Sequence, residues 1–300
     1  MRDAFFNGLY EVIKADKNVM VLTADHGAFG LNRIKEDFPD QYLNMGIAEQ
    51  NMASVAAGLA LSGKIVYIYS IINFVTLRCL EQINIDIASM NLHVNIVGVG
   101  AGFTYSTDGP THHGTQDVAI MSAIPNLSIY NSSDAVNSNA FAKMGYEKEG
   151  PKYIRIEKGI VPGLYEKGRS FEKGIAKVQD GKDTYILSSG VMVHKAIEAA
   201  KSLDENSSAV GVFDLYRIKP INQNILIDYL APVKKLLIIE DNIATGGLCD
   251  KISSILMSKK SKIDIKVLNV TDMFSFNYSQ KRDQVEKQSK LNVANIVEML

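Results

Sequence analysis

Cysteine and tryptophan are scarce in this chain of 300 residues, which has two cysteines, Cys79 and Cys249, and no tryptophan. Two thiols are too few to build a disulfide framework or a zinc cluster of thiolates. The cysteine count therefore favours a reducing compartment, and we expect a cytoplasmic protein.

An excess of charge of either sign is also missing. The chain has 32 Lys and Arg residues against 33 Asp and Glu residues, and its net charge is -1. Such a balance offers no basic field to attract a phosphate backbone, so we expect no nucleic acid partner. The first residues carry Asp3 and Glu11 within an apolar stretch, unlike a signal peptide.

Long apolar runs are absent as well. The longest apolar region, Met52 to Leu61, ends at Ser62-Gly63-Lys64. It is shorter than the roughly 20 residues that cross a bilayer as a helix, so we expect no membrane segment.

Short apolar, β-branched runs instead alternate with longer amphipathic stretches, which is typical of an α/β fold with parallel sheets. We predict two domains, each a mainly parallel sheet flanked by helices. The predicted strands are 19–23, 65–70, 94–100, 127–130 and 153–156, then 184–189, 209–214, 235–240 and 263–270. The predicted helices are 2–15, 48–62, 73–90 and 134–146, then 191–202, 221–230, 247–258 and 290–300.

The polar stretch from Lys158 to Lys173 contains Gly and Pro and has no sustained period, which indicates a connection between domains. We therefore predict a first domain over residues 1–160, a linker over 161–172 and a second domain over 173–300.

The glycines of Gly98-Val99-Gly100-Ala101-Gly102-Phe103 follow a predicted strand, but they do not form a dinucleotide-binding motif. Phe103 stands at the third glycine position, and the following TYSTDGP cannot open a helix that would hold a pyrophosphate. We interpret these glycines as a strand end where a loop packs closely on a ligand or another chain.

The loop Asp108-Gly109-Pro110-Thr111-His112-His113-Gly114 brings an acid and two imidazoles to the carboxyl end of the same strand, where open α/β sheets bind ligands. A solvated turn is the alternative that the residues leave open. We expect no metal site, because adjacent histidines on an extended loop point to opposite sides and no third ligand has suitable spacing.

Glu49 stands at the head of the apolar helix predicted at 48–62. It either complements the helix dipole or is a carboxyl in apolar surroundings that stays protonated and donates a hydrogen bond. Phe74, at a strand-to-helix edge, is either a core residue or a face for stacking on a planar ligand. Composition alone does not choose between these roles.

Three segments together, GIAEQ at 46–50, FVTLRCLEQI at 74–83 and DGPTHHG at 108–114, resemble the pyrimidine-binding half of transketolases. The resemblance continues in residues 115–134 and in FDLYRIKPI and IIEDNIATGGL, at 213–221 and 238–248. Complete transketolases also hold thiamine diphosphate and a divalent cation through a GDG motif, which this chain lacks. The chain therefore looks like the C-terminal subunit of a split transketolase.

This resemblance implies roles for several residues. Glu49 matches the glutamate that bonds to the aminopyrimidine ring and helps the cofactor lose the proton of its reactive carbon. Phe74 matches the aromatic that stacks on this ring, and Arg78 and Met45 are expected to contact the cofactor. His112 matches the catalytic histidine near the first carbons of the bound sugar.

The resemblance also implies a substrate site. Asp108 matches an acid that contacts a substrate hydroxyl, and Arg155 resembles the arginine that binds a substrate phosphate. His113 stands where the family commonly has Gln, and His26 lies in a loop that touches phosphate in many transketolases. We expect all four residues, together with His112, to bind a sugar or a sugar phosphate.

The implied cofactors are thiamine diphosphate and Mg²⁺ or Ca²⁺, the metal being held by an N-terminal subunit that carries the GDG motif. We expect a ketol transferase that is active only with this partner and that forms a dimer or an α2β2 heterotetramer. The alternatives are the β subunit of a 2-oxo-acid dehydrogenase, an enzyme similar to deoxyxylulose-phosphate synthase, and a non-enzymatic module that kept the fold.

Overall fold

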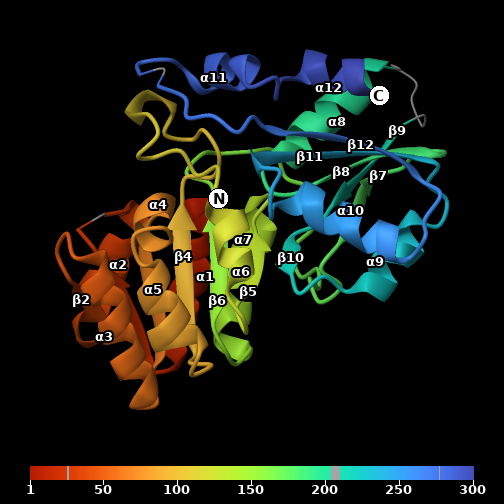
Figure 1. Ribbon diagram of the computed structural model, residues 1–300. Coiled ribbons are helices and arrows are strands. Elements are labelled where there is room, and N and C mark those ends of the chain that lie inside the picture. The colour runs from red at the N-terminus through yellow and green to blue at the C-terminus, as the bar shows by residue number, and fades with distance from the viewer. Residues whose placement is uncertain (26, 204–209, 277) are drawn as a thin grey trace.

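Two mainly parallel sheets organise the chain into two lobes that lie side by side (Figure 1). The computed structural model describes residues 1–25, 27–203, 210–276 and 278–300. Within these residues one sheet has seven strands and the other has five. The predicted α/β class and the two sheets flanked by helices are confirmed.

The first sheet has the order β10-β5-β6-β4-β3-β1-β2, and its strands are parallel except for β10, which pairs antiparallel with β5. Its strands are β1 Val19–Thr23, β2 Tyr42–Asn44, β3 Ile65–Ile71, β4 Val94–Val99, β5 Ser128–Asn131, β6 Lys152–Ile156 and β10 Arg217–Lys219. The central strands are apolar runs without alternation, because helices cover both faces of the sheet.

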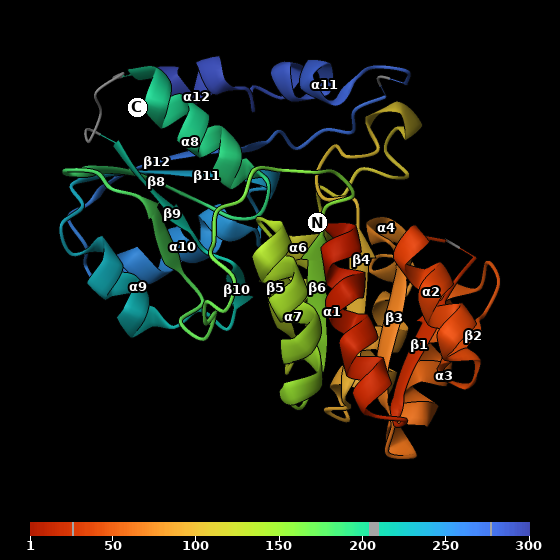
Figure 2. The same ribbon diagram turned by 180° about the vertical axis from the view of Figure 1, so that it is seen from behind.

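The helices of the first lobe divide between these two faces. Helices α1 and α7 pack together on one face, seen from behind in Figure 2, and α3, α4, α5 and α6 lie on the other, seen in Figure 1. The helices and helical turns are α1 Arg2–Ala15, α2 Phe29–Asp37, η1 Pro39–Gln41, α3 Glu49–Leu61, α4 Ile72–Val75, α5 Leu80–Gln82, η2 Ile83–Ala88, η3 Ser106–Asp108, α6 Asp117–Ala123 and α7 Ala135–Glu147.

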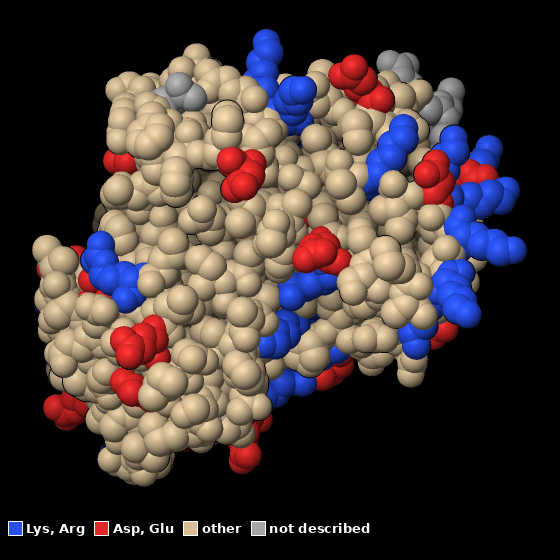
Figure 3. Space-filling model, in the orientation of Figure 1, with Lys and Arg blue, Asp and Glu red and all other residues tan. Residues whose placement is uncertain are grey.

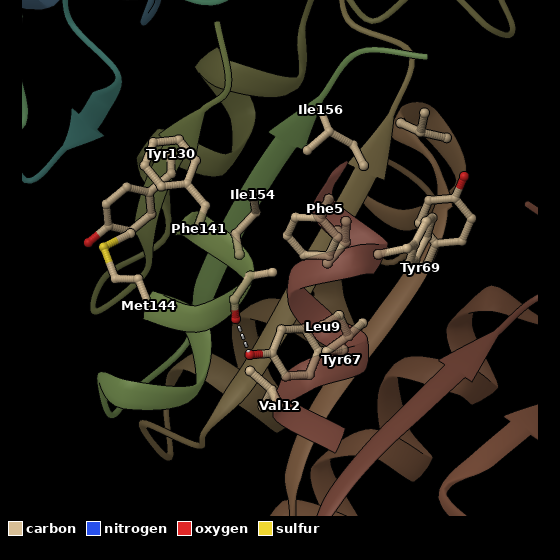
Figure 4. Packing of buried hydrophobic residues seen from close by; sticks show 14 of the residues in the cluster. Phe5, Leu9, Val12, Tyr67, Tyr69, Tyr130, Phe141, Met144, Ile154 and Ile156 are labelled. Carbon is tan, nitrogen blue, oxygen red and sulfur yellow. Dashed lines mark hydrogen bonds between the residues drawn. The ribbon is translucent and has the colours of Figure 1, made fainter. Parts of the chain in front are cut away.

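An aromatic core joins α1 and α7 to the sheet. Phe5 of α1 packs edge-on against Tyr67 of β3, with ring centroids 6.5 Å apart, and Phe141 of α7 lies beside Tyr130 (Figure 4). The Tyr67 hydroxyl donates a hydrogen bond of 2.7 Å to the carbonyl oxygen of Ala142. This buried tyrosine therefore finds the polar partner that its hydroxyl requires.

The second sheet has the order β12-β11-β8-β9-β7, with β7 antiparallel to β9 at one edge. Helices α8, α11 and α12 lie above it in Figure 1, and α9 and α10 lie below it. Its elements are β7 Ala176–Gln179, β8 Thr184–Ser188, α8 Met192–Leu203, β9 Val210–Asp214, α9 Gln223–Leu230, β11 Lys235–Ile243, α10 Leu248–Ser258, β12 Asp264–Val270, α11 Arg282–Gln288 and α12 Val293–Met299. The predicted first residue of β9, Ala209, lies outside the described residues.

The single helix predicted at 73–90 is wrong. The structure has α4, a turn, α5 and a π-helical segment, η2, in its place. The Thr76 hydroxyl donates to the Ile72 carbonyl oxygen at 2.6 Å, and the Cys79 thiol donates to that of Phe74 at 3.2 Å. The Thr76 N–H still bonds to the Ile72 carbonyl oxygen, but the Arg78 N–H bonds to that of Asn73, five residues back, while the Cys79 thiol takes that of Phe74. The α-helical pattern is therefore interrupted here.

One strand, β10, crosses from the second lobe to the sheet of the first, and the predicted division at 161–172 does not include this crossing. Strand β10 follows the second lobe's β9 in the chain, but it pairs with β5 at the edge of the first sheet. Residues 217–219 therefore fasten the second lobe to the first.

A buried polar cluster reinforces this connection. Asp214, at the end of β9, accepts hydrogen bonds from the hydroxyls of Ser133, which lies between β5 and α7, and of Tyr165, which lies in the connection between the lobes. Burial raises the pKa of Asp214 to about 7, although both hydroxyl donors oppose the rise. The folded protein therefore holds a proton that the unfolded chain releases near its ordinary pKa of 3.8.

This raised pKa makes stability depend on pH. As pH rises from about 4 to about 7, the unfolded chain loses the proton of Asp214 and the folded chain keeps it, so the free energy of unfolding falls by a few kcal/mol. Because the amide of Asp214→Asn does not titrate, we expect this variant to show a shallower fall. Urea unfolding between pH 5 and pH 8 measures it.

Asp228→Asn, at an exposed position of α9, is the matched control and should retain the wild-type slope. An Asp214→Asn profile parallel to that of the wild type would contradict the titration of Asp214.

Candidate functional site

Three segments of the first lobe meet at the carboxyl edge of its sheet. Helix α3 begins at Glu49 after β2, α4 carries Phe74 directly after β3, and a loop over residues 101–114 follows β4. The carboxyl ends of parallel strands point to one edge of a sheet, and there open α/β sheets bind ligands.

Glu49 and Arg78 form an ion pair at this edge. The Nη1 atom of Arg78 donates to Oε2 of Glu49 at 2.7 Å. The Glu49 side chain is only 3% exposed, whereas that of Arg78 is 42% exposed. The carboxylate is thus held inside the protein, and the cation covers it from the solvent side.

Phe74 lies between Arg78 and His112. The Cζ atom of Arg78 is 4.3 Å from the centroid of the Phe74 ring, and the ring of His112 meets the same phenyl ring edge-on with centroids 5.0 Å apart. The structure therefore brings Glu49, Arg78, Phe74 and His112 into one continuous set of contacts, although they come from three separate segments.

The loop that carries His112 is fixed at its base and along its length. Gly102 and Gly114 exchange two backbone hydrogen bonds of 3.0 and 2.8 Å, which closes the base. The Asn73 amide of α4 donates to the carbonyl oxygens of Pro110 and Thr111 at 3.3 and 3.0 Å. Asn73 was missed in the sequence, since only the fold shows that it positions the loop.

Asp108 lies on this loop with its side chain exposed. The Thr107 hydroxyl donates to its Oδ2 at 3.3 Å, and the Thr111 hydroxyl donates to its backbone oxygen at 3.4 Å. The Thr111 hydroxyl also lies 2.9 Å from Nδ1 of His112. Asp108, Thr111 and His112 thus form a polar rim beside Phe74.

His113 points away from this rim. Its side chain is buried, its ring packs edge-on against Phe103 with centroids 5.1 Å apart, and its Nε2 lies 3.4 Å from the Ser106 carbonyl oxygen. Burial lowers the pKa of His113, which therefore favours the neutral imidazole. It lines a cavity of about 80 Å³ between the loop and the second lobe, together with Met273 and Phe274.

Arg155 lies in the interior, which does not fit its predicted contact with a substrate phosphate. The side chain is fully buried between two acids, with Nε 2.9 Å from Asp117 and Nη1 2.8 Å from Asp241. Its Nη2 donates to the carbonyl oxygen of Gly114 at 2.7 Å. All three guanidinium nitrogens are thus bonded within the chain, so Arg155 joins α6, the loop base and β11 of the second lobe.

Lys158, which follows the end of β6, is exposed. Its Nζ lies 5.3 Å from the ring centroid of Tyr105, which is in the His112 loop. An exposed ammonium at this place suits a phosphate contact better than the buried Arg155 does. The sequence pointed to Arg155 because the pattern does not by itself show that Lys152 and Arg155 of β6 are both buried, while Lys158, just beyond the strand, is exposed.

The remaining predicted residues have simpler placements. Met45 is half-buried and packs against the apolar core below α3. His26 lies outside the described residues. Among the described residues, no three His, Cys, Asp or Glu side chains are grouped so that they could hold a metal ion. A search of the same residues finds no helix with the length and apolar character to span a membrane.

The fold and site define a two-domain α/β subunit with a ligand site at the carboxyl edge of its first sheet. Residues 1–163 match the model of the transketolase pyrimidine binding domain, and residues 174–296 match the model of the transketolase C-terminal domain. The chain belongs to the transketolase family. The predicted resemblance is confirmed, and membership of this family implies thiamine diphosphate as the cofactor.

Individual relatives have the same extent. A putative transketolase C-terminal section of Methanocaldococcus jannaschii is 32% identical over 100% of this chain and 95% of that protein. One subunit of an apulose-4-phosphate transketolase from Phocaeicola vulgatus is 29% identical, over 90% and 87% of the two chains. A solved structure described as a split gene transketolase, inactive beta4 tetramer, matches with a TM-score of 0.89 and 30% identity over 99% and 96% of the two chains.

The burial of Arg155 predicts a large effect on stability. Arg155→Met leaves the carboxylates of Asp117 and Asp241 without their cation, and removing one partner of a buried ion pair costs about 3–5 kcal/mol. We expect a loss of that size in the free energy of unfolding, measured with urea at pH 7.

Arg33→Met is the matched control, because Arg33 pairs with Asp37 at 3.7 Å on the exposed surface. Its loss should be at most about 1 kcal/mol. Equal losses in the two variants would contradict the structural role of Arg155.

Proposed function

We propose that the chain is the C-terminal subunit of a split transketolase and transfers a two-carbon ketol unit from a ketose to an aldose. In this proposal the cofactor lies between this chain, which holds the pyrimidine ring, and a partner subunit, which holds the diphosphate and its Mg²⁺ or Ca²⁺. The arrangement of Glu49 and Phe74 carries the proposal.

The pair Glu49 and Phe74 fits an aminopyrimidine. The guanidinium of Arg78 is a flat group with N–H donors, and it already lies over the Phe74 ring while bonding to the Glu49 carboxylate. An aminopyrimidine is also flat and carries N–H donors, so the same ring face and carboxylate suit it. Met45 completes the proposed cofactor contacts, and Arg78, which the resemblance also implies at this site, lies at the position proposed for the ring.

We propose separate roles in the reaction for the residues of this chain. When bound, thiamine diphosphate supplies a nucleophilic carbon for attack on a ketone. Glu49 would hold a nitrogen of the pyrimidine ring and favour the tautomer whose exocyclic nitrogen accepts a proton. His112, which contacts the same phenyl ring, would bond to a hydroxyl or oxyanion on the first carbons of the sugar.

The polar rim supports a hydroxylated substrate. Asp108, Thr111 and His112 offer several donors and acceptors, whereas a branched 2-oxo acid would favour an apolar pocket. Lys158, exposed beside Tyr105, replaces Arg155 as the residue that we propose for a substrate phosphate. His113 and His26 remain proposals for the same substrate, although His113 faces the second lobe.

Three observations support a partner. The chain lacks a GDG motif, and most of the surface over α4 and the His112 loop is tan in Figure 3, with a few charged side chains among it. Four exposed apolar side chains cluster beside this loop: Met273, Phe274, Phe276 and Tyr278. Exposed apolar patches of this kind mark protein interfaces.

The Tyr278 ring connects the apolar cluster to the His112 loop. A Cβ atom on Gly109 would lie 2.3 Å from this ring, so only glycine permits the contact. We propose that the cluster and the loop dock on the diphosphate-binding subunit in an α2β2 assembly. The relative described as a beta4 tetramer supports self-association of such subunits. Cys79 and Cys249 are both buried and unpaired, which supports the proposed cytoplasmic location.

Glu49→Gln tests the role of the carboxyl group. The amide fills the same space but cannot support the same proton transfer, so exchange of the hydrogen on the cofactor's reactive carbon should slow by about 10²- to 10⁴-fold. NMR on the complex reconstituted with the partner measures this exchange. Glu11→Gln, exposed on α1, is the control, and an unchanged rate in Glu49→Gln would reduce Glu49 to a residue that complements the helix dipole.

Donor selection by His112 tests the reaction class. Sites that bond substrate hydroxyls discriminate strongly against analogues without them. His112→Ala should therefore reduce kcat/KM at least tenfold more with a ketose phosphate or hydroxypyruvate than with pyruvate. A wild-type preference for pyruvate with release of carbon dioxide would instead favour a synthase or a 2-oxo-acid dehydrogenase.

A further inference from the structure

Arg78 makes, within the free chain, the two contacts that the proposed function assigns to the aminopyrimidine ring. Its guanidinium bonds to Glu49 at 2.7 Å and lies 4.3 Å from the centroid of Phe74. The edge of the His112 ring borders the same phenyl ring, with centroids 5.0 Å apart. The guanidinium therefore fills the space above Phe74 that a stacked ring requires.

The ion pair has a physical reason in the free chain. A carboxylate as buried as that of Glu49, 3% exposed, is costly unless a partner compensates its charge. Among the described residues, Arg78 supplies the one ion pair of Glu49. The free subunit therefore needs Arg78 at this place for as long as no other group bonds to Glu49.

The Arg78 side chain can also move away from Glu49. Its side chain is 42% exposed, and it lies in the turn between α4 and α5, where its backbone N–H bonds to the Asn73 carbonyl oxygen at 3.2 Å. Rotation of a long side chain from such a turn into solvent breaks no helical hydrogen bond. The guanidinium can therefore leave Glu49 without any change in the backbone.

We infer that Arg78 is a placeholder: it occupies the pyrimidine position in the free subunit, compensates the charge of Glu49, and is displaced when the cofactor binds. This inference rests on the proposed function. It assigns Arg78 a role opposite to that of a simple cofactor ligand, because the cofactor competes with Arg78 for the same carboxylate and the same ring face.

The competition lowers the apparent affinity for the cofactor by the fraction of molecules in which Arg78 has moved away. Arg78→Met removes the competing cation and keeps a side chain of similar length. In the complex reconstituted with the partner subunit, isothermal titration with thiamine diphosphate and Mg²⁺ should show a dissociation constant lower than that of the wild type, on the order of tenfold.

Arg33→Met is the matched control. Arg33 also stacks on an aromatic ring, with Cζ 3.6 Å from the Tyr10 centroid, and also pairs with an acid, Asp37. It lies on α2, outside the contacts of Glu49 and Phe74, so its removal should leave the dissociation constant unchanged.

A second measurement needs no cofactor. In the chain alone, Arg78→Met leaves Glu49 uncompensated and should lower the thermal unfolding midpoint, whereas the double variant Glu49→Gln/Arg78→Met should recover most of that loss. The absence of such coupling would overturn the inference, since it would mean that Arg78 does not compensate Glu49.

The binding outcomes separate the inference from the proposed function. If the wild-type complex binds the cofactor and Arg78→Met binds it more weakly, Arg78 is a ligand and the placeholder role is rejected, while the proposed function stands. If the wild-type complex does not bind the cofactor, the proposed function is rejected, and the inference with it.

Discussion

The buried guanidinium of Arg155 is the constraint on which the arrangement of this subunit depends. It bonds at once to Asp117 of α6, to Asp241 of β11 and to the carbonyl oxygen of Gly114. These groups belong to the first lobe, the second lobe and the base of the site loop, respectively. Burial raises the pKa of Asp241 even though Arg155 opposes the rise, so the acid is held where its charge is costly. The buried charge of Arg155 is compensated by Asp117 and Asp241 only if all three segments stay together.

The site depends on this junction through the position of its loop. The Gly114 carbonyl oxygen accepts a hydrogen bond from Arg155, and Gly114 also pairs with Gly102. The base of the loop is therefore fixed at the end of the sheet. The Asn73 amide then bonds to the loop and holds it against α4, where His112 contacts Phe74. The second lobe holds the other side of this region, since Arg282 of α11 bonds to the buried carboxylate of Glu157 at 2.7 Å.

In the proposed function, this subunit presents half of a binding site, and the exposed side chains around it include Arg78 and Asp108. Glu49 and Phe74 would bond to and stack on the pyrimidine ring of thiamine diphosphate, whereas the diphosphate is assigned to the partner subunit. The proposed division of the site between chains would place binding of the pyrimidine ring and binding of the diphosphate on separate surfaces. It would also leave the buried Glu49 without a bound ring before assembly, and in the structure Arg78 forms an ion pair with Glu49.

The sequence by itself predicted the α/β class, most helix and strand positions and the family, because periodicity and contiguous motifs are local properties of the chain. It also pointed to Glu49, Phe74 and His112, which the structure brings together. Tertiary structure alone decided that the guanidinium of Arg155 is bonded within the core, because its partners lie 38 and 86 residues away. It also decided that β10 joins the first sheet and that His113 turns away from His112. These outcomes depend on contacts between distant segments, whose geometry exists only when the two lobes have packed together.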